Sequence, residues 1–126
     1  MSANSAFEAI TSRMAWTTSA AIDKYEAVMV GTDGLLAPAT GAAPFVGIAQ
    51  YPAAAAGDMC TVVTGIFPCM ASAAITAGAR VKCDASNAGK CVTAAAADDA
   101  VGVALMDIAT GTIGSILMVD SNGTAA

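Results

Sequence analysis

An internal repeat sets the first limit on how this chain can fold. Residues 46–49 have the sequence VGIA, and 55 residues later 101–104 have the sequence VGVA. After a shift of one residue, 59–64 aligns with 113–118. A strand-rich unit of about fifty residues covers little of its own hydrophobic face. We therefore expect two copies of one unit to close a single core between them.

Both halves of the chain have the pattern of short β-strands. Beyond the first two dozen residues, apolar or alternating runs are separated by turn sequences such as TDG, TGAAP and PAAAAG. This spacing is typical of sandwiches and barrels. We predict one all-β domain over 25–126, a small β-barrel or β-tulip-like sandwich built from two repeated strand units, about 25–67 and 78–120. Gly47 and Gly102 occupy equivalent places in the repeat, where a strand glycine commonly marks a bulge or a tight corner.

The first 24 residues differ from the rest, and we expect them to form an N-terminal arm that is either extended or a short helix. The segment opens with capping-box spacing, and Phe7, Ile10 and Met14 recur at helical intervals. A helix of about ten residues is marginal alone in water. These apolar side chains and Trp16 are therefore expected to be buried, either on the chain's own domain or against a partner.

The composition is acidic and poor in charge. Charged residues make up 12% of the chain, which is about half the usual share. The net charge is −5, and the five lysines and arginines are scattered, so no basic patch is available for nucleic acid. A surface with so few charges favours self-association, which indicates a subunit of an oligomer or a larger assembly.

Membrane insertion and secretion are not expected. Every apolar run is interrupted well short of the ~18 residues that a spanning helix needs. The N-terminus lacks the basic region and the apolar core of a signal peptide. Synthesis in the cytosol is therefore predicted.

The four cysteines are Cys60, Cys69, Cys83 and Cys91. Their spacing lacks the close ligand pair of a zinc site, so we expect no metal. Cytosolic thiols stay reduced, and the simplest role for these residues is that of small buried hydrophobic side chains. Cys83 and Cys91 lie on the two arms of a predicted hairpin, where a cross-strand disulfide is possible in an oxidising medium.

The sequence offers no catalytic constellation. It contains no histidine, which excludes Ser-His-Asp and Cys-His nucleophile pairs and histidine metal sites. Asp98 and Asp99 are the one adjacent acidic pair, and they lie in an alanine-rich connection that is expected to be a solvated loop. We predict a protein that is not an enzyme and that binds no cofactor.

The order of motifs over about 55–119 resembles the head decoration, or capsid cement, proteins of tailed bacteriophages. The resemblance rests on AGD at 56–58 followed by CTVVTGIF, on the hairpin AAITAGARVKCDASNAGKCVT, on VGVA, and on TGTIGSILMV. The chain departs from the family pattern at Cys83, where an aromatic residue is common, and in its long segment 1–24.

The resemblance implies a structural protein that is made in the host cytoplasm and coats the outer surface of the virion head. Proteins of this kind are β-rich and commonly trimeric, and they stabilise the shell by bridging major capsid protein subunits. Their N-terminal segments often reach the shell, so Phe7, Ile10, Met14 and Trp16 are the expected contacts. The alternatives are a minor tail- or fibre-associated β module of the virion, or a secreted adhesin-like binding domain with disulfides.

Overall fold

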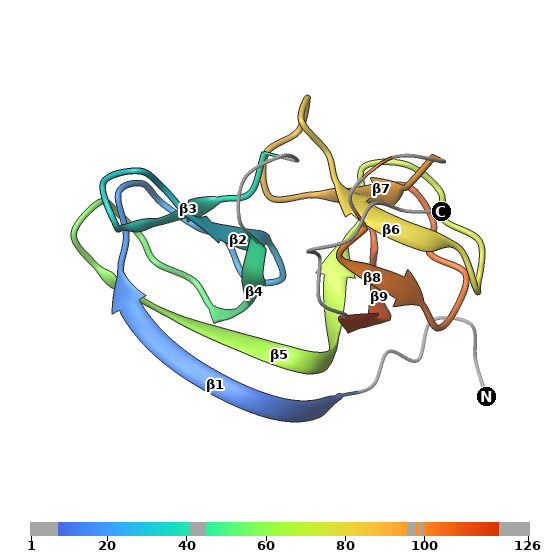
Figure 1. Ribbon diagram of the computed structural model, residues 1–126, viewed down its shortest axis with the longest axis horizontal. Helices are drawn as coiled ribbons and strands as arrows, with labels where there is room; N and C mark the ends of the chain where they lie inside the picture. Colours follow the sequence, from blue (N-terminus) through green and yellow to red (C-terminus); the bar gives the residue numbers. More distant parts are fainter. Residues whose placement is uncertain (1–7, 41–44, 96–97, 99, 119–126) are drawn as a thin grey trace.

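The computed structural model describes residues 8–40, 45–95, 98 and 100–118. Nine antiparallel strands form one sheet that curls into a half-barrel (Figure 1), and no helix occurs within the described ranges. The all-β prediction is therefore confirmed. The strands are β1 (Ala9–Thr17), β2 (Ala27–Val30), β3 (Leu36–Pro38), β4 (Phe45–Tyr51), β5 (Met59–Met70), β6 (Arg80–Cys83), β7 (Cys91–Thr93), β8 (Gly102–Ala104) and β9 (Ile113–Met118).

The strand order has the same arrangement on both sides of its centre. It runs β3-β2-β4-β5-β9-β8-β6-β7, and β1 pairs with β5 off this path. The N-terminal part of β5 pairs with β1 and β4, and its C-terminal part pairs with β9. In Figure 1, β1 and β5 run together along one side of the molecule, with β2, β3 and β4 towards one end and β6 to β9 towards the other.

Strand pairing repeats along the chain in the same register. Thr17 lies opposite Met59 in the β1–β5 pair, as Met70 lies opposite Ile113 in the β5–β9 pair. The C-terminal part of β5 is therefore the counterpart of β1. Two other contacts recur in the same way. The bridge between Ile22 and Ala53 is repeated by the bridge between Ile75 and Ile108. The hydrogen bond from the Tyr25 N–H to the Ala49 carbonyl is repeated by the one from Gly78 to Ala104.

The N-terminal segment is a strand of the sheet. Residues 9–17 form β1 and pair with β5 over almost their whole length, so the helical alternative for this segment is wrong. The reason is tertiary, because a nine-residue ladder along an open edge of β5 satisfies backbone groups that a marginal helix leaves partly unpaired. The first repeated unit thus begins within β1. Phe7 lies outside the described residues.

Two clusters of buried side chains form the core. The smaller lies in the first half and consists of Ile22, Val28, Leu36, Ala49, Ala53, Cys60 and Val62. The larger contains most of the equivalent residues of the second half together with Ala27, Ala39, Ile48 and Val63 of the first. Ala27, Ile48 and Val63 lie opposite one another across β2, β4 and β5, so this row is buried where the two halves meet.

Candidate interaction surface

Four of the five large hydrophobic side chains that are exposed in the described part of the chain lie on β1 or on the strand ends next to it. Trp16 is 53% exposed and Met14 is 41% exposed, while Tyr51 and Met59 are 56% and 58% exposed. The Trp16 indole Nε1 donates to the Gly34 carbonyl at 3.0 Å, so one edge of the ring is anchored to the β2–β3 turn. About half of the Trp16 surface remains open to solvent.

The predicted contact residues differ in what they offer to a partner. Met14 and Trp16 lie opposite the buried Val62 and Cys60 of β5, on the same face of the sheet, and both remain exposed. Ile10 is half-buried and packs on the larger core cluster, so it attaches β1 to the body.

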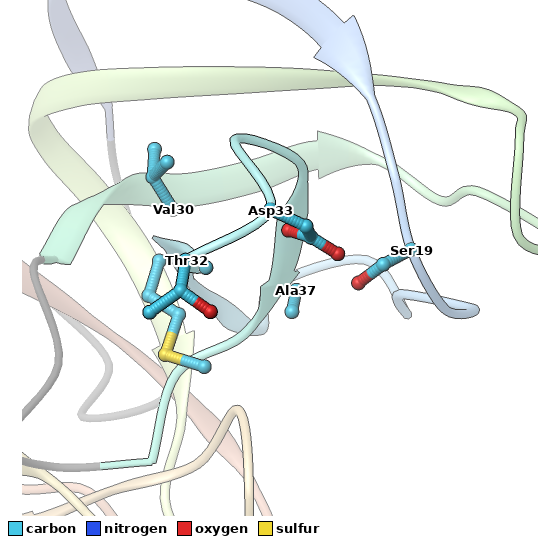
Figure 2. Close-up of a pocket in the computed structure, with 7 residues that line it drawn as sticks. Ser19, Val30, Thr32, Asp33 and Ala37 are labelled. Atoms are coloured by element: carbon cyan, nitrogen blue, oxygen red, sulfur yellow. The ribbon is translucent and has the colours of Figure 1, made fainter.

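A shallow hollow of about 350 Å³ lies beside the β2–β3 hairpin (Figure 2). Its carboxylate, Asp33, accepts a hydrogen bond from the Leu35 backbone N–H at 3.0 Å and so shapes the turn. One acidic group without a neighbouring base or cation provides no acid–base pair. The lining residues are Ser19, Met29, Val30, Gly31, Thr32, Asp33 and Ala37.

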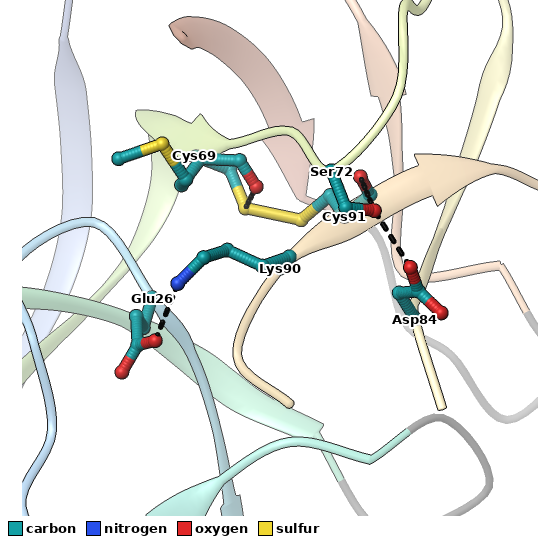
Figure 3. The surroundings of a disulfide bond; sticks show 7 residues. Glu26, Cys69, Ser72, Asp84, Lys90 and Cys91 are labelled. Carbon is teal, nitrogen blue, oxygen red and sulfur yellow. Dashed lines mark hydrogen bonds and ion pairs between the residues drawn. A yellow bond between two sulfur atoms is a disulfide. The ribbon is translucent and has the colours of Figure 1, made fainter. Parts of the chain in front are cut away.

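The structure pairs Cys91 with Cys69 in a disulfide (Figure 3). Cys83 does lie opposite Cys91 in the β6–β7 pair, as expected for the hairpin, but the bond that forms is to Cys69 and not the possible one to Cys83. The end of β5 brings Cys69 to a Cα–Cα distance of 6.7 Å from Cys91, within the range that a disulfide spans. Cys60 is buried, and burial raises the pKa of its thiol, which makes it unreactive.

Beside the disulfide, a polar contact joins the two halves (Figure 3). The Lys90 Nζ lies 2.7 Å from Glu26 Oε2, and Glu26 is only 7% exposed. The neighbouring Ala27 N–H donates to the Gly89 carbonyl at 2.7 Å. The β6–β7 turn is thereby fixed to the start of β2. The sequence analysis identified neither this ion pair nor the Cys69–Cys91 bond.

Asp84 organises the same turn. The Ser72 hydroxyl donates to its Oδ2 at 2.6 Å, and Asn87 and the Ser86 backbone N–H donate as well. These hydrogen bonds, the one from Ser72 first, hold the pKa of the Asp84 carboxyl below its ordinary value.

The carboxylate considered for catalysis is part of an ion pair. Asp98 lies 2.9 Å from Lys82 Nζ, and the hydrogen bond from that ammonium lowers the pKa of the Asp98 carboxyl. Asp99 lies outside the described residues. Across the described part of the chain, no three His, Cys, Asp or Glu residues gather as a metal site, and no helix is long enough to cross a membrane.

These features describe a β scaffold with an exposed apolar strand. The family model for phage cement proteins matches residues 8–118. The chain belongs to the phage cement protein family. Membership makes this cement protein a non-enzymatic, structural component of a phage head, as the resemblance over 55–119 implied.

The fold also has a solved counterpart. The N-terminal base of head fibre gp8.5 of bacteriophage phi29 superposes with a TM-score of 0.66 at 14% identity. The match covers 87% of this chain and 95% of that one. At this identity the similarity concerns the fold alone. A search of curated proteins finds no match.

Proposed function

We propose that this cement protein binds the outer surface of the head shell as an oligomer and bridges neighbouring major capsid protein subunits. Bridging opposes the separation of shell subunits under the pressure of packaged DNA. The observation that carries the proposal is the match to the cement protein family over 8–118. The low charge of the chain is in keeping with a surface that is largely covered in an assembly.

The N-terminal segment supplies contact surface in this proposal. Of the four expected contacts, Phe7, Ile10, Met14 and Trp16, the exposed pair Met14 and Trp16 offers apolar area that the decorated head would cover. Burying such a side chain completely contributes about 1.5–3 kcal/mol. A single copy therefore binds weakly, and a homotrimer that presents three such surfaces gains avidity of roughly 10²–10⁴ for each added site.

The copy number in virions tests this function. Virions of the source phage are purified on a density gradient, and the protein is counted against the major capsid protein by quantitative mass spectrometry. We expect about one copy per shell subunit. Absence from the particle would overturn the proposal.

A second candidate is the base of a head fibre, which the fold shared with the phi29 head-fibre base favours. A fibre base is needed at a limited number of positions on the head. A count of a handful of copies per particle would therefore select this candidate over a cement that coats the shell. The Cys69–Cys91 disulfide is in keeping with the secreted adhesin-like alternative, but the match to the cement protein family over 8–118 favours a protein of the head.

A further inference from the structure

We propose that a second copy of this chain covers the exposed face of β1, in a head-to-tail contact that repeats the contact between the two halves of one chain. The inference deepens the proposed function, on which its biological purpose rests, by naming the surface through which the oligomer forms. Its test needs only the purified protein.

The contact inside one chain provides the template. Ala27, Ile48 and Val63 form a row across the sheet of the first half, and all three are fully buried. They share a continuous core cluster with Phe67 and Cys69 from the C-terminal part of β5. One half thus contributes a row of three side chains, and the other contributes the strand residues that join it in the core.

At the end of the second half, the equivalent row is open. Arg80 lies opposite Val103, and Val103 lies opposite Leu117, across β6, β8 and β9. Arg80 is exposed, Val103 is half-buried and Leu117 is 39% exposed. This row has no following half within the described chain to cover it.

At the other end, the equivalent strand residues are open as well. Met14 lies opposite Val62 as Phe67 lies opposite Ile116, which makes Met14 the counterpart of the buried Phe67. By the same register, Trp16 is the counterpart of Cys69. Within the described residues, neither Met14 nor Trp16 is covered as Phe67 and Cys69 are. A single chain therefore exposes one surface of each kind, and the two are complementary.

Charge supports the same pairing. Inside the chain, Ala27 contacts Gly89 in the β6–β7 turn. The counterpart of Gly89 is Gly34 in the β2–β3 turn, since both have a positive φ (84° and 78°) at equivalent places in the two hairpins. The counterpart of Ala27 is Arg80. Repeating the contact between two chains brings Arg80 of one copy to the turn at Gly34 of the next, where Asp33 is exposed.

The resulting interface is heterologous, because each copy contributes two different surfaces. Such contacts either close into a ring or continue as a filament. The two surfaces belong to opposite halves of the sheet, since β1 is followed by the bridge between Thr18 and Leu36 of β3, while β9 lies in the other half (Figure 1). A closed ring of three copies is the arrangement that agrees with the proposed trimer.

A charge swap tests the interface by native mass spectrometry and light scattering, without any shell. We expect the wild-type protein to be oligomeric, and Arg80→Asp or Asp33→Arg alone to weaken association about tenfold or more. The double variant, R80D with D33R, should recover most of the association. Leu117→Arg and Trp16→Ala should also dissociate the oligomer. Lys24→Asp is the matched control, a charge reversal at an exposed position outside both surfaces, and circular dichroism checks that each variant is folded.

Two outcomes would overturn the inference. One is a monomeric wild-type protein. The other is an oligomer that every one of these substitutions leaves intact, because the contact would then lie elsewhere on the molecule. Decoration of the head is tested separately by the copy number in virions, and a monomeric protein would remove only the oligomer from the proposed function.

Discussion

At Gly47 and Gly102, a neighbouring strand passes where a side chain would otherwise lie. A Cβ atom on Gly102 would come within 2.6 Å of the Leu117 carbonyl oxygen, and one on Gly47 would meet the carbonyl oxygen of Val63. Val63 and Leu117 are themselves equivalent in the two halves. The repeated glycine that the sequence displays therefore has one physical cause, which is the close approach of the adjacent strand.

We expect Gly102→Ala to lower the free energy of unfolding by about 1–3 kcal/mol, because the strands must move apart. Gly47→Ala should cost roughly 1–3 kcal/mol more, since its φ of 149° is unfavourable for alanine. Gly57→Ala is the control, with a positive φ but open space around the added methyl group. Urea denaturation followed by circular dichroism measures all three. An equal fall in the free energy of unfolding for all three variants would show that the close distance to the adjacent strand does not matter.

Asp84 should make stability depend on acid pH. Its pKa is depressed in the folded protein, so its contribution is fully present above the unfolded value of about 3.9 and is lost as pH falls through the folded value. Ser72→Ala removes the hydrogen bond that lowers the Asp84 pKa most, so this pKa should rise towards its unfolded value. The stability lost on acidification should then become smaller. Carboxyl NMR titration of both proteins measures the shift. An unchanged Asp84 pKa in the variant would refute the assignment.

The element that differs most from its predicted role is β1. The sequence predicted an arm outside the β domain, and the structure shows a strand of the sheet. Deleting residues 1–16 should expose the buried Cys60 and Val62 of β5. We expect a loss of about 3 kcal/mol and a fall in Tm of roughly 10 °C. Deleting residues 1–7 leaves β1 intact and is the control. If both truncated proteins melted like the full chain, β1 would contribute nothing to the body.

The disulfide between the end of β5 and β7 can be located by peptide mapping. Trypsin cuts after Lys24, Arg80, Lys82 and Lys90, so Cys69 and Cys91 fall on different peptides, and Cys83 falls on a third. In air-oxidised protein we expect 25–80 to be linked to 91–126, with fragmentation placing the bond at Cys69. Linkage of 83–90 to 91–126 would restore the Cys83 pairing instead. Replacing Cys69 and Cys91 with Ser should cost about 3 kcal/mol.

For the whole molecule, the shared strand β5 makes the two halves one continuous sheet, and the same kind of contact is available between copies. If binding to the head depends on several copies acting together, a monomeric Arg80→Asp variant should bind undecorated heads roughly 10²–10⁴ times more weakly than wild type. Co-sedimentation with heads that lack the protein measures this ratio. Equal binding by monomer and oligomer would show that each copy binds the shell independently.

The first repeated unit could be recognised only in part from the sequence. Residues 46–49 and 101–104 are similar because both must supply the same strand and the same close-packed glycine. Residues 12–17 and 65–70 are structurally equivalent but share no identical amino acid. The second segment is largely buried and the first is largely exposed, so different side chains suit the same backbone. That is why the expected boundary at residue 25 missed β1.

The sequence by itself determined the all-β class and the doubled core, because turn residues, alternation and a repeated strand are local patterns. Only the tertiary structure decided the partner of Cys91 and the conformation of residues 9–17. Both depend on β5, a strand distant along the chain that reaches Cys91 at one end and pairs with β1 at the other. The spacing of apolar residues along the chain indicates which side chains will be buried. The neighbouring strands in the folded protein decide what those side chains pack against.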